Sequence, residues 1–153
     1  MARVTIDELL AAARKRLHRL GPAEARSAQA NGATLIDIRP DNQIATEGMI
    51  PGALIIPRNV LGWRLDPDRA HRHAHAPDPE ASVIVVCNEG YQSSLVAATL
   101  QELGFSRATD LDGGFQAWRA AGLPVTPPAA GATTRGWAPR REPRPAGPTA
   151  SVA

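Results

Sequence analysis

VIVVCNEGYQSSLVAATLQELG, residues 83–104, contains the only cysteine of the chain. The short β-branched run at 83–86 is typical of a strand buried on both faces. From Ser94 the residues favour a helix, which Gly104 closes. Cys87 therefore lies on a strand–loop–helix turn at the carboxyl end of a predicted parallel strand. Open α/β sheets bind ligands at that edge, so Cys87 is the first candidate functional residue.

Length and composition limit the class of protein. A chain of 153 residues with 43% hydrophobic residues is typical of one soluble globular domain. No stretch approaches the ~20 apolar residues of a membrane span. A lone cysteine excludes an intramolecular disulfide framework and indicates a reducing compartment. We expect a cytoplasmic protein without a membrane anchor.

The positive charge is concentrated at the carboxyl end. Residues 126–153 carry four arginines and one glutamate, while residues 1–125 have a net charge of −1. Because the main part of the chain is close to neutral, we do not expect a nucleic-acid partner.

The order of predicted elements indicates an α/β fold. Thr5 and Glu8 form a capping-box pair for a helix reaching Leu20, and a second helix runs from Pro22 to about Ala30. The basic residues at 14–19 are interpreted as a solvated helix face. Residues 66–81 predict a long loop. Strands are expected at 34–38, 53–56, 83–86 and 108–111, with a last helix at 115–121.

These elements predict three parts of the chain. Residues 1–31 form a helical segment that packs on the domain, residues 32–126 form the domain itself, and residues 127–153 form a disordered Pro/Ala/Arg tail. Alternating strands and helices predict a parallel sheet covered on both faces.

The loop after the cysteine has the properties of an anion site. Its six residues, Cys87 to Gln92, precede a helix, so successive N–H groups can point inward and stabilise a thiolate. Gly90 permits the torsions that such a loop requires. Ser93 or Ser94 can cap the helix or donate to the anion. The competing interpretation is an inert cysteine buried in the core.

Several segments resemble the single-domain rhodanese-like sulfurtransferases. The similar stretches are LIDIRP at 35–40, EGMIPGALIIP at 47–57, VVCNEGYQSS at 85–94 and ATDLDGGFQAWRAAGLPV at 108–125. Their order matches the family, and the resemblance covers about 90 residues.

The resemblance implies a rhodanese-like fold with a central five-stranded parallel sheet flanked by helices. It also implies a sulfurtransferase that moves sulfane sulfur from a donor to a thiol or cyanide through a persulfide on Cys87. The substrate-binding residues are then those of the loop, acting through their backbones: Asn88, Glu89, Gly90, Tyr91, Gln92 and Ser93. Arg39 and Arg58 are two further substrate-binding candidates from outside the loop. No metal or organic cofactor is implied. The expected partners are a small-molecule or protein persulfide donor and a thiol acceptor, and the oligomeric state is open.

Two departures from the family bear on the activity. Met49 stands where the family has histidine, and the loop carries Glu89 but no cation. A carboxylate at the pocket mouth disfavours a dianionic donor such as thiosulfate. For Arg39, an ion pair with Asp37 is the competing interpretation.

The main alternative function is a non-catalytic rhodanese-like module that binds a partner protein. A third alternative, which the sequence favours less, is a small cysteine-dependent phosphatase or arsenate reductase. Three alternating histidines, His71, His73 and His75, are not expected to bind metal, because they lie in a loop without a partnering cysteine. Trp118 and Phe115 are expected to pack the last helix, and Trp63 either lines the pocket or covers the core.

Overall fold

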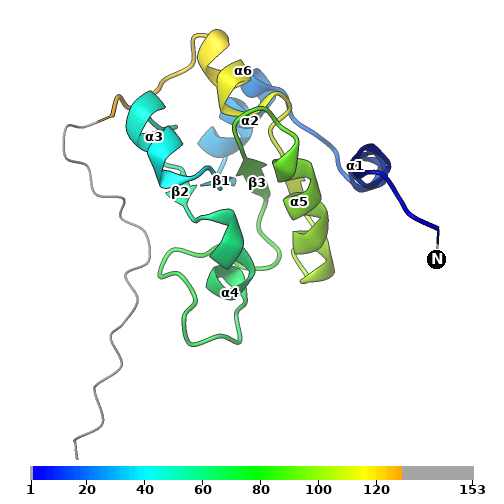
Figure 1. Ribbon diagram of the computed structural model, residues 1–153. Helices are drawn as coiled ribbons and strands as arrows, with labels where there is room; N and C mark the ends of the chain where they lie inside the picture. The colour runs from blue at the N-terminus through cyan, green and yellow to red at the C-terminus, as the bar shows by residue number, and fades with distance from the viewer. Residues whose placement is uncertain (1, 129–153) are drawn as a thin grey trace, which may run out of the picture.

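The computed structural model describes residues 2–128, which form a parallel sheet between two layers of helices (Figure 1). The predicted disorder of the tail falls almost wholly on residues 129–153, which lie outside the described residues. In chain order the elements are α1 (Ile6–Lys15), α2 (Pro22–Ala30), β1 (Thr34–Asp37), α3 (Asp41–Glu47), β2 (Leu54–Ile55), a 3₁₀ turn η1 (Arg58–Val60), α4 (Leu61–Leu65), β3 (Val83–Val86), α5 (Gln92–Glu102), β4 (Ala108–Asp110) and α6 (Gly114–Ala120).

Within residues 2–128 the sheet has four strands in the order β2-β1-β3-β4, all parallel. The prediction of five strands is therefore wrong in number, although the α/β class is confirmed. The edge beyond β4 carries one isolated parallel bridge, between Leu20 and Leu111. Leu20 N donates to the carbonyl of Asp110 at 3.1 Å, and Asp112 N donates to that of Leu20 at 2.8 Å. Because Pro22 begins α2 two residues later, the segment is too short to extend this pairing into a strand.

Each face of the sheet has its own apolar core. On one face, α4 and α5 cover side chains of β1 and β3, including Ile36, Val83 and Val85. On the other, Ala25 of α2 and Trp118 of α6 pack against Leu35 and other strand residues. Phe115 and Trp118 are fully buried, which confirms that they pack the last helix. All four side chains of β3 are buried, as its continuous apolar run predicts.

Three segments can be compared with the elements predicted from the sequence. The capping box of Thr5 and Glu8 is confirmed, but the first helix ends at Lys15, Arg16 closes it as a helical C-cap, and residues 17–20 are not helical. Helix α3 was not predicted. The long loop is confirmed, since no helix or strand lies between Leu65 and Val83.

Among the described residues, no helix is long and apolar enough to span a membrane.

Helix α1 lies outside the sheet and the two helix layers that cover it, alongside α5 (Figure 1). Gln101 Nε2 of α5 donates to the carbonyl of Arg16 at 3.1 Å, and Arg16 forms an exposed ion pair with Glu102. The first helix and the residues after it are thus held along α5, and this placement brings them to the loop that follows β3.

Candidate functional site

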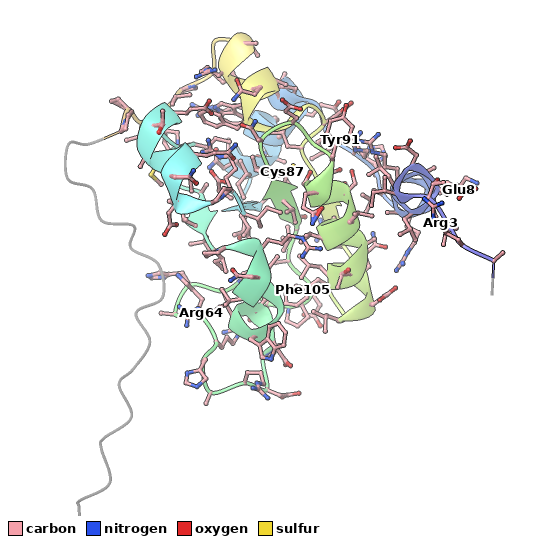
Figure 2. The ribbon with its side chains drawn as sticks, viewed as in Figure 1. Arg3, Glu8, Arg64, Cys87, Tyr91 and Phe105 are labelled. Carbon is pink, nitrogen blue, oxygen red and sulfur yellow. The ribbon has the colours of Figure 1, made fainter. Side chains whose placement is uncertain are left out.

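Cys87 is the first residue after β3, and its loop leads into α5 (Figure 2). Its Sγ accepts hydrogen bonds from the N–H groups of Gly90 at 3.2 Å and Ser93 at 3.3 Å. Gly90 has φ +86°, the left-handed torsion that the sequence analysis expected there. The side chain is buried, with 7% of the residue exposed, but it lies at the floor of a pocket. Two converging N–H donors favour an anionic sulfur at this position.

The amino end of α6 supports the loop from behind. Phe115 N donates to the carbonyl of Cys87 at 2.9 Å, and Gln116 N donates to that of Asn88 at 3.1 Å. Gly114 allows this approach, because a Cβ there would lie 2.5 Å from the carbonyl oxygen of Cys87. The Gly113-Gly114 pair therefore keeps the first part of the loop fixed against the sheet.

Asp110, at the end of β4, fixes the second part of the loop. Its carboxylate is fully buried and accepts from the hydroxyls of Ser93 at 2.8 Å and Ser94 at 2.7 Å. Neither serine side chain caps α5, whose N-cap is Tyr91 without a side-chain bond. The serines thus join the loop to the sheet instead of serving as caps, because Asp110 offers a charged acceptor beside them.

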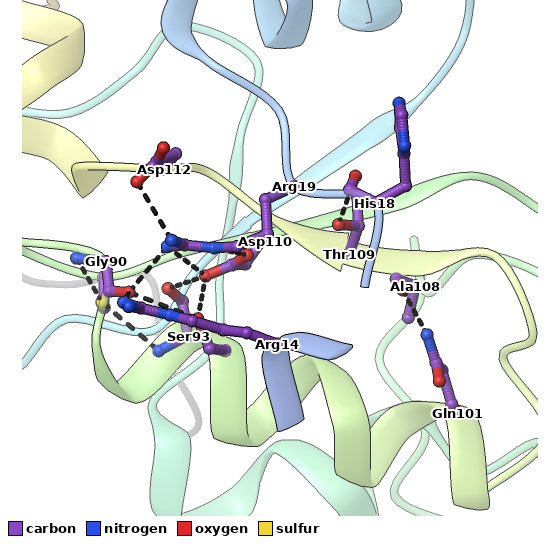
Figure 3. Close-up of polar contacts among 12 residues, drawn as sticks. Arg14, His18, Arg19, Gly90, Ser93, Gln101, Ala108, Thr109, Asp110 and Asp112 are labelled. Atoms are coloured by element: carbon purple, nitrogen blue, oxygen red, sulfur yellow. Dashed lines mark hydrogen bonds and ion pairs between the residues drawn. The ribbon is translucent and has the colours of Figure 1, made fainter. Parts of the chain in front are cut away.

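Two arginines of the amino-terminal segment reach the same loop (Figure 3). Nη2 of Arg14 and Nη2 of Arg19 each donate to the carbonyl of Gly90 at 2.9 Å. Arg19 also pairs with Asp110 at 2.9 Å and with Asp112 at 3.1 Å. The interpretation of this basic cluster as a solvated helix face is therefore wrong for Arg14 and Arg19, although it holds for Arg16.

The positive charge of Arg19 is stabilised by acidic groups close to the sulfur-binding loop. Burial by itself lowers the pKa of Arg19, but the hydrogen bond and charge of Asp110, together with Asp112 and Cys87, raise it above the ordinary value. Arg19 is therefore a permanent cation behind the sulfur. Sequence reasoning missed both arginines. The available signal was a loop without its own cation in a chain with a basic cluster elsewhere.

The pocket above Cys87 has a volume of about 730 Å³. Its lining combines residues of the β1–α3 turn, η1 and the loop: Ile38, Arg39, Pro40, Gln43, Pro57, Arg58, Asn59, Cys87, Asn88, Glu89, Tyr91 and Gln92. Arg58 and Glu89 are both exposed, and they place opposite charges on its wall. Gln92 lies beside Arg58, and its amide oxygen can turn to accept from the guanidinium. The predicted residues from Cys87 to Ser93 and Arg58 are thus brought together.

Arg39 lines the pocket, but its guanidinium is engaged in contacts within the protein. Its guanidinium is fully buried, forms an ion pair with Asp37 at 2.7 Å and donates to the carbonyl of Gly48 at 2.8 Å. It also stacks on the ring of Phe115, 3.8 Å from the centroid. The ion pair with Asp37 that the sequence analysis weighed against substrate contact is present, and these contacts occupy most of the guanidinium.

The other candidates lie away from Cys87. Among the described residues, no group of three histidine, cysteine or acidic side chains is arranged to hold a metal ion. His73 and His75 have ring centroids 5.9 Å apart, and burial, Arg64 and His75 lower the pKa of His73. Trp63 is 59% exposed and lines a second, mainly apolar pocket of about 380 Å³ between α4 and α5, which shares Arg58 with the Cys87 pocket. It therefore neither covers the core nor lines the Cys87 pocket.

Comparison with known proteins identifies the family. The family model of the rhodanese-like domain matches residues 21–121. The chain belongs to the rhodanese-like family. It is 37% identical over 102 residues to the thiosulfate sulfurtransferase GlpE of Ectopseudomonas mendocina (strain ymp), covering 67% of this chain and 84% of that protein. The resemblance inferred from the sequence motifs is confirmed.

Two solved structures have a similar fold. The polysulfide-sulfur transferase homodimer of Wolinella succinogenes is similar with a TM-score of 0.62 and 26% identity, covering 79% of this chain and 86% of that chain. A Rhodopseudomonas palustris CGA009 protein of unknown function, described as a possible tyrosine phosphatase, is similar with a TM-score of 0.75 and 28% identity, covering 82% and 97%. The family match begins at residue 21, so Arg14 and Arg19 lie outside it.

Proposed function

We propose that this rhodanese-like protein is a sulfurtransferase in which Cys87 carries sulfane sulfur as a persulfide. The observation that supports this most directly is the convergence of the Gly90 and Ser93 N–H groups on Sγ, at 3.2 and 3.3 Å. A thiolate in that position is nucleophilic and stabilised. The terminal sulfur of a persulfide is also anionic, and we propose that the backbone N–H groups of the loop from Asn88 to Ser93 hold it.

The reaction then has two steps. The Cys87 thiolate attacks the outer sulfur of a donor such as thiosulfate, the donor S–S bond breaks, and sulfite leaves with the electron pair. This leaves Cys87-S-S⁻. In the second step, an acceptor thiolate or cyanide attacks the outer sulfur of the persulfide, and Cys87 leaves as the thiolate. No electrons are gained or lost overall, and the cysteine alone carries the sulfur between steps.

The charges of the pocket bear on the choice of donor. Arg58 offers a cation to an anionic substrate, while Glu89 offers a repelling carboxylate on the same wall. A small-molecule or protein persulfide donor and a thiol acceptor fit the wide pocket, and we infer that thiosulfate is the weaker donor. A reducing compartment keeps a single thiol free, so we propose that the protein acts in the cytoplasm.

A sulfur-transfer assay with cyanide as acceptor tests the proposal. Thiocyanate formation is measured with thiosulfate, glutathione persulfide and polysulfide as donors, for the wild type and for Cys87→Ser. We expect turnover with at least one donor for the wild type and none for Cys87→Ser. A folded wild-type protein inactive with all three donors would favour the non-catalytic binding module.

The likeness to the R. palustris protein raises a second candidate, a cysteine-dependent phosphatase. The loop argues against it, because the six residues from Cys87 to Gln92 include no arginine to bind a phosphate dianion. Hydrolysis of p-nitrophenyl phosphate by the wild type but not by Cys87→Ser would support the phosphatase. Its absence, with sulfur transfer present, would eliminate that candidate.

A further inference from the structure

The carbonyl of Gly90 is the point where the amino-terminal segment holds the sulfur-binding loop. It accepts from Arg14 and Arg19 at 2.9 Å each. The N–H of the same residue donates to Cys87 Sγ. Gly90 is therefore fixed at both ends, its carbonyl by the two arginines and its N–H by the sulfur (Figure 3).

The second N–H donor to the sulfur is tied to the same network. Ser93 N donates to Sγ, while its hydroxyl donates to Asp110. Asp110 in turn receives Nε of Arg19 at 2.9 Å and Nη2 at 3.2 Å. Arg19 thus touches the Gly90 carbonyl directly and reaches Ser93 through Asp110, so one guanidinium orients both donors.

Behind the loop two carboxylates and two guanidinium groups balance in number, but both carboxylates pair with the same arginine. Behind the loop, Asp110 and Asp112 pair with Arg19. Arg14 forms no ion pair among the described residues; it donates to Ser94 and Gly90 and lies 5.6 Å from the centroid of the Tyr91 ring. On the pocket side, Arg58 and Glu89 both line the pocket, and Arg39 is paired with Asp37.

We propose that Arg14 and Arg19 are positioning residues for Cys87, which hold the Gly90 and Ser93 N–H groups on its sulfur and supply from the amino-terminal segment the cation that the loop lacks. This inference rests on Cys87 being the reacting thiolate of the proposed function. Neither arginine lines the pocket, so their effect on substrate passes through the loop. Substitutions there act on the rate of the sulfur-transfer step and leave substrate affinity largely unchanged.

Arg14 is the better residue to test. Removing Arg19 deprives the buried Asp110 carboxylate of its cation, which destabilises the fold as well as the site. Arg14→Met keeps the apolar stem and a helix-forming residue on α1. Arg14→Lys keeps the charge without the planar fork. Arg16→Met is the matched control, because Arg16 lies two residues away and its side chain pairs, within the described part of the chain, only with the exposed Glu102.

Two measurements are made on all four proteins. The first is the rate of Cys87 alkylation by iodoacetamide, a neutral reagent, as a function of pH. The second is sulfur transfer to cyanide, with kcat and KM separated. Alkylation does not depend on sulfur transfer, so it tests the positioning role even if the wild type proves inactive as a sulfurtransferase.

For Arg14→Met we expect alkylation at neutral pH to slow by about tenfold and its pH profile to move upward, because one charge-assisted contact to the loop is lost. We expect kcat to fall while KM stays within about twofold. Arg14→Lys should recover at least half of the loss, and Arg16→Met should match the wild type. An Arg14→Met protein that melts like the wild type and is alkylated at the wild-type rate would overturn the inference.

Discussion

Replacing Gly90 with alanine is a direct test of the N–H groups around Cys87. Gly90 has φ +86°, and a Cβ there would lie 2.8 Å from Gly113 N and 3.2 Å from the carbonyl oxygen of Leu111. Both contacts are backbone atoms of the turn between β4 and α6, which cannot yield as a side chain does. The Gly90 peptide must therefore move, and its N–H must move away from the sulfur.

Gly104 provides a matched control. It also has a positive φ, +99°, but a Cβ there would meet nothing within 4 Å, and it follows α5 at the end away from Cys87. An alanine in the left-handed region costs about 1–2 kcal/mol at either position. For a domain of this size that lowers Tm by roughly 3–8 °C. Gly90→Ala adds the cost of its close contacts, about 1–3 kcal/mol.

The two variants should differ most in activity. We assume that these close contacts displace the N–H donors from the sulfur. A loss of about 1–3 kcal/mol of transition-state stabilisation then lowers the sulfur-transfer rate by roughly fivefold to 150-fold. Gly104→Ala should keep the wild-type rate at temperatures where it is folded. The assay is thiocyanate formation, with melting curves for both proteins. Wild-type kinetics for Gly90→Ala would refute the role of the loop N–H groups, and an equal loss in Gly104→Ala would attribute the effect to stability.

Three further predictions concern the cysteine, the pocket charge and the tail. Cys87→Ser should abolish transfer yet melt like the wild type, since a hydroxyl is nearly isosteric and cannot form a persulfide; retained turnover would disprove the mechanism. Glu89→Arg should raise kcat/KM for thiosulfate several-fold, mainly through a lower KM, and the gain should shrink at high ionic strength; equal kinetics at low salt would exclude this charge from donor choice. Removal of residues 129–153 should leave Tm and transfer unchanged, because their Pro/Ala/Arg composition offers little to bury and Thr126 keeps its pairing with Met49; a large drop in Tm would show that the tail docks.

The sequence predicted the parts of the site that depend on local chemistry. A β-branched run, a lone cysteine and a glycine three residues later are enough to predict a strand, a nucleophile and a loop with a left-handed turn. The structure has all three, with β3, Cys87 and Gly90 in those roles. Local patterns succeed here because the strand, the loop and the helix follow one another within 22 residues of chain.

The parts that depend on distant contacts were not predictable in this way. Arg14 lies 76 residues and Arg19 71 residues from Gly90 in the chain, and no local pattern specifies that they meet it. The first helix ends at Lys15 although apolar spacing continues to Leu20, because Leu20 pairs with the edge of β4 instead. Tertiary pairing at the sheet edge thus overrides helix propensity, and it carries Arg19 to Asp110.

Arg39 shows the limit of inference from residue type. An arginine after a strand near the pocket is a reasonable substrate ligand, but its neighbour two residues earlier decides its role. Asp37 is fully buried and requires a cation, and Arg39 supplies it through Nη2 at 2.7 Å. The exposed Arg58, which has no such partner among the described residues, is left as the cation that a substrate can reach.

The central claim is that Cys87 carries sulfur, and intact-protein mass spectrometry tests it most directly. The protein is purified without reductant, incubated with a sulfane-sulfur donor and measured before and after addition of cyanide. We predict a mass increase equal to one sulfur atom, located on the peptide that contains Cys87 and removed by cyanide with release of thiocyanate. A folded protein whose Cys87 gains no sulfur from thiosulfate, glutathione persulfide or polysulfide would contradict the account.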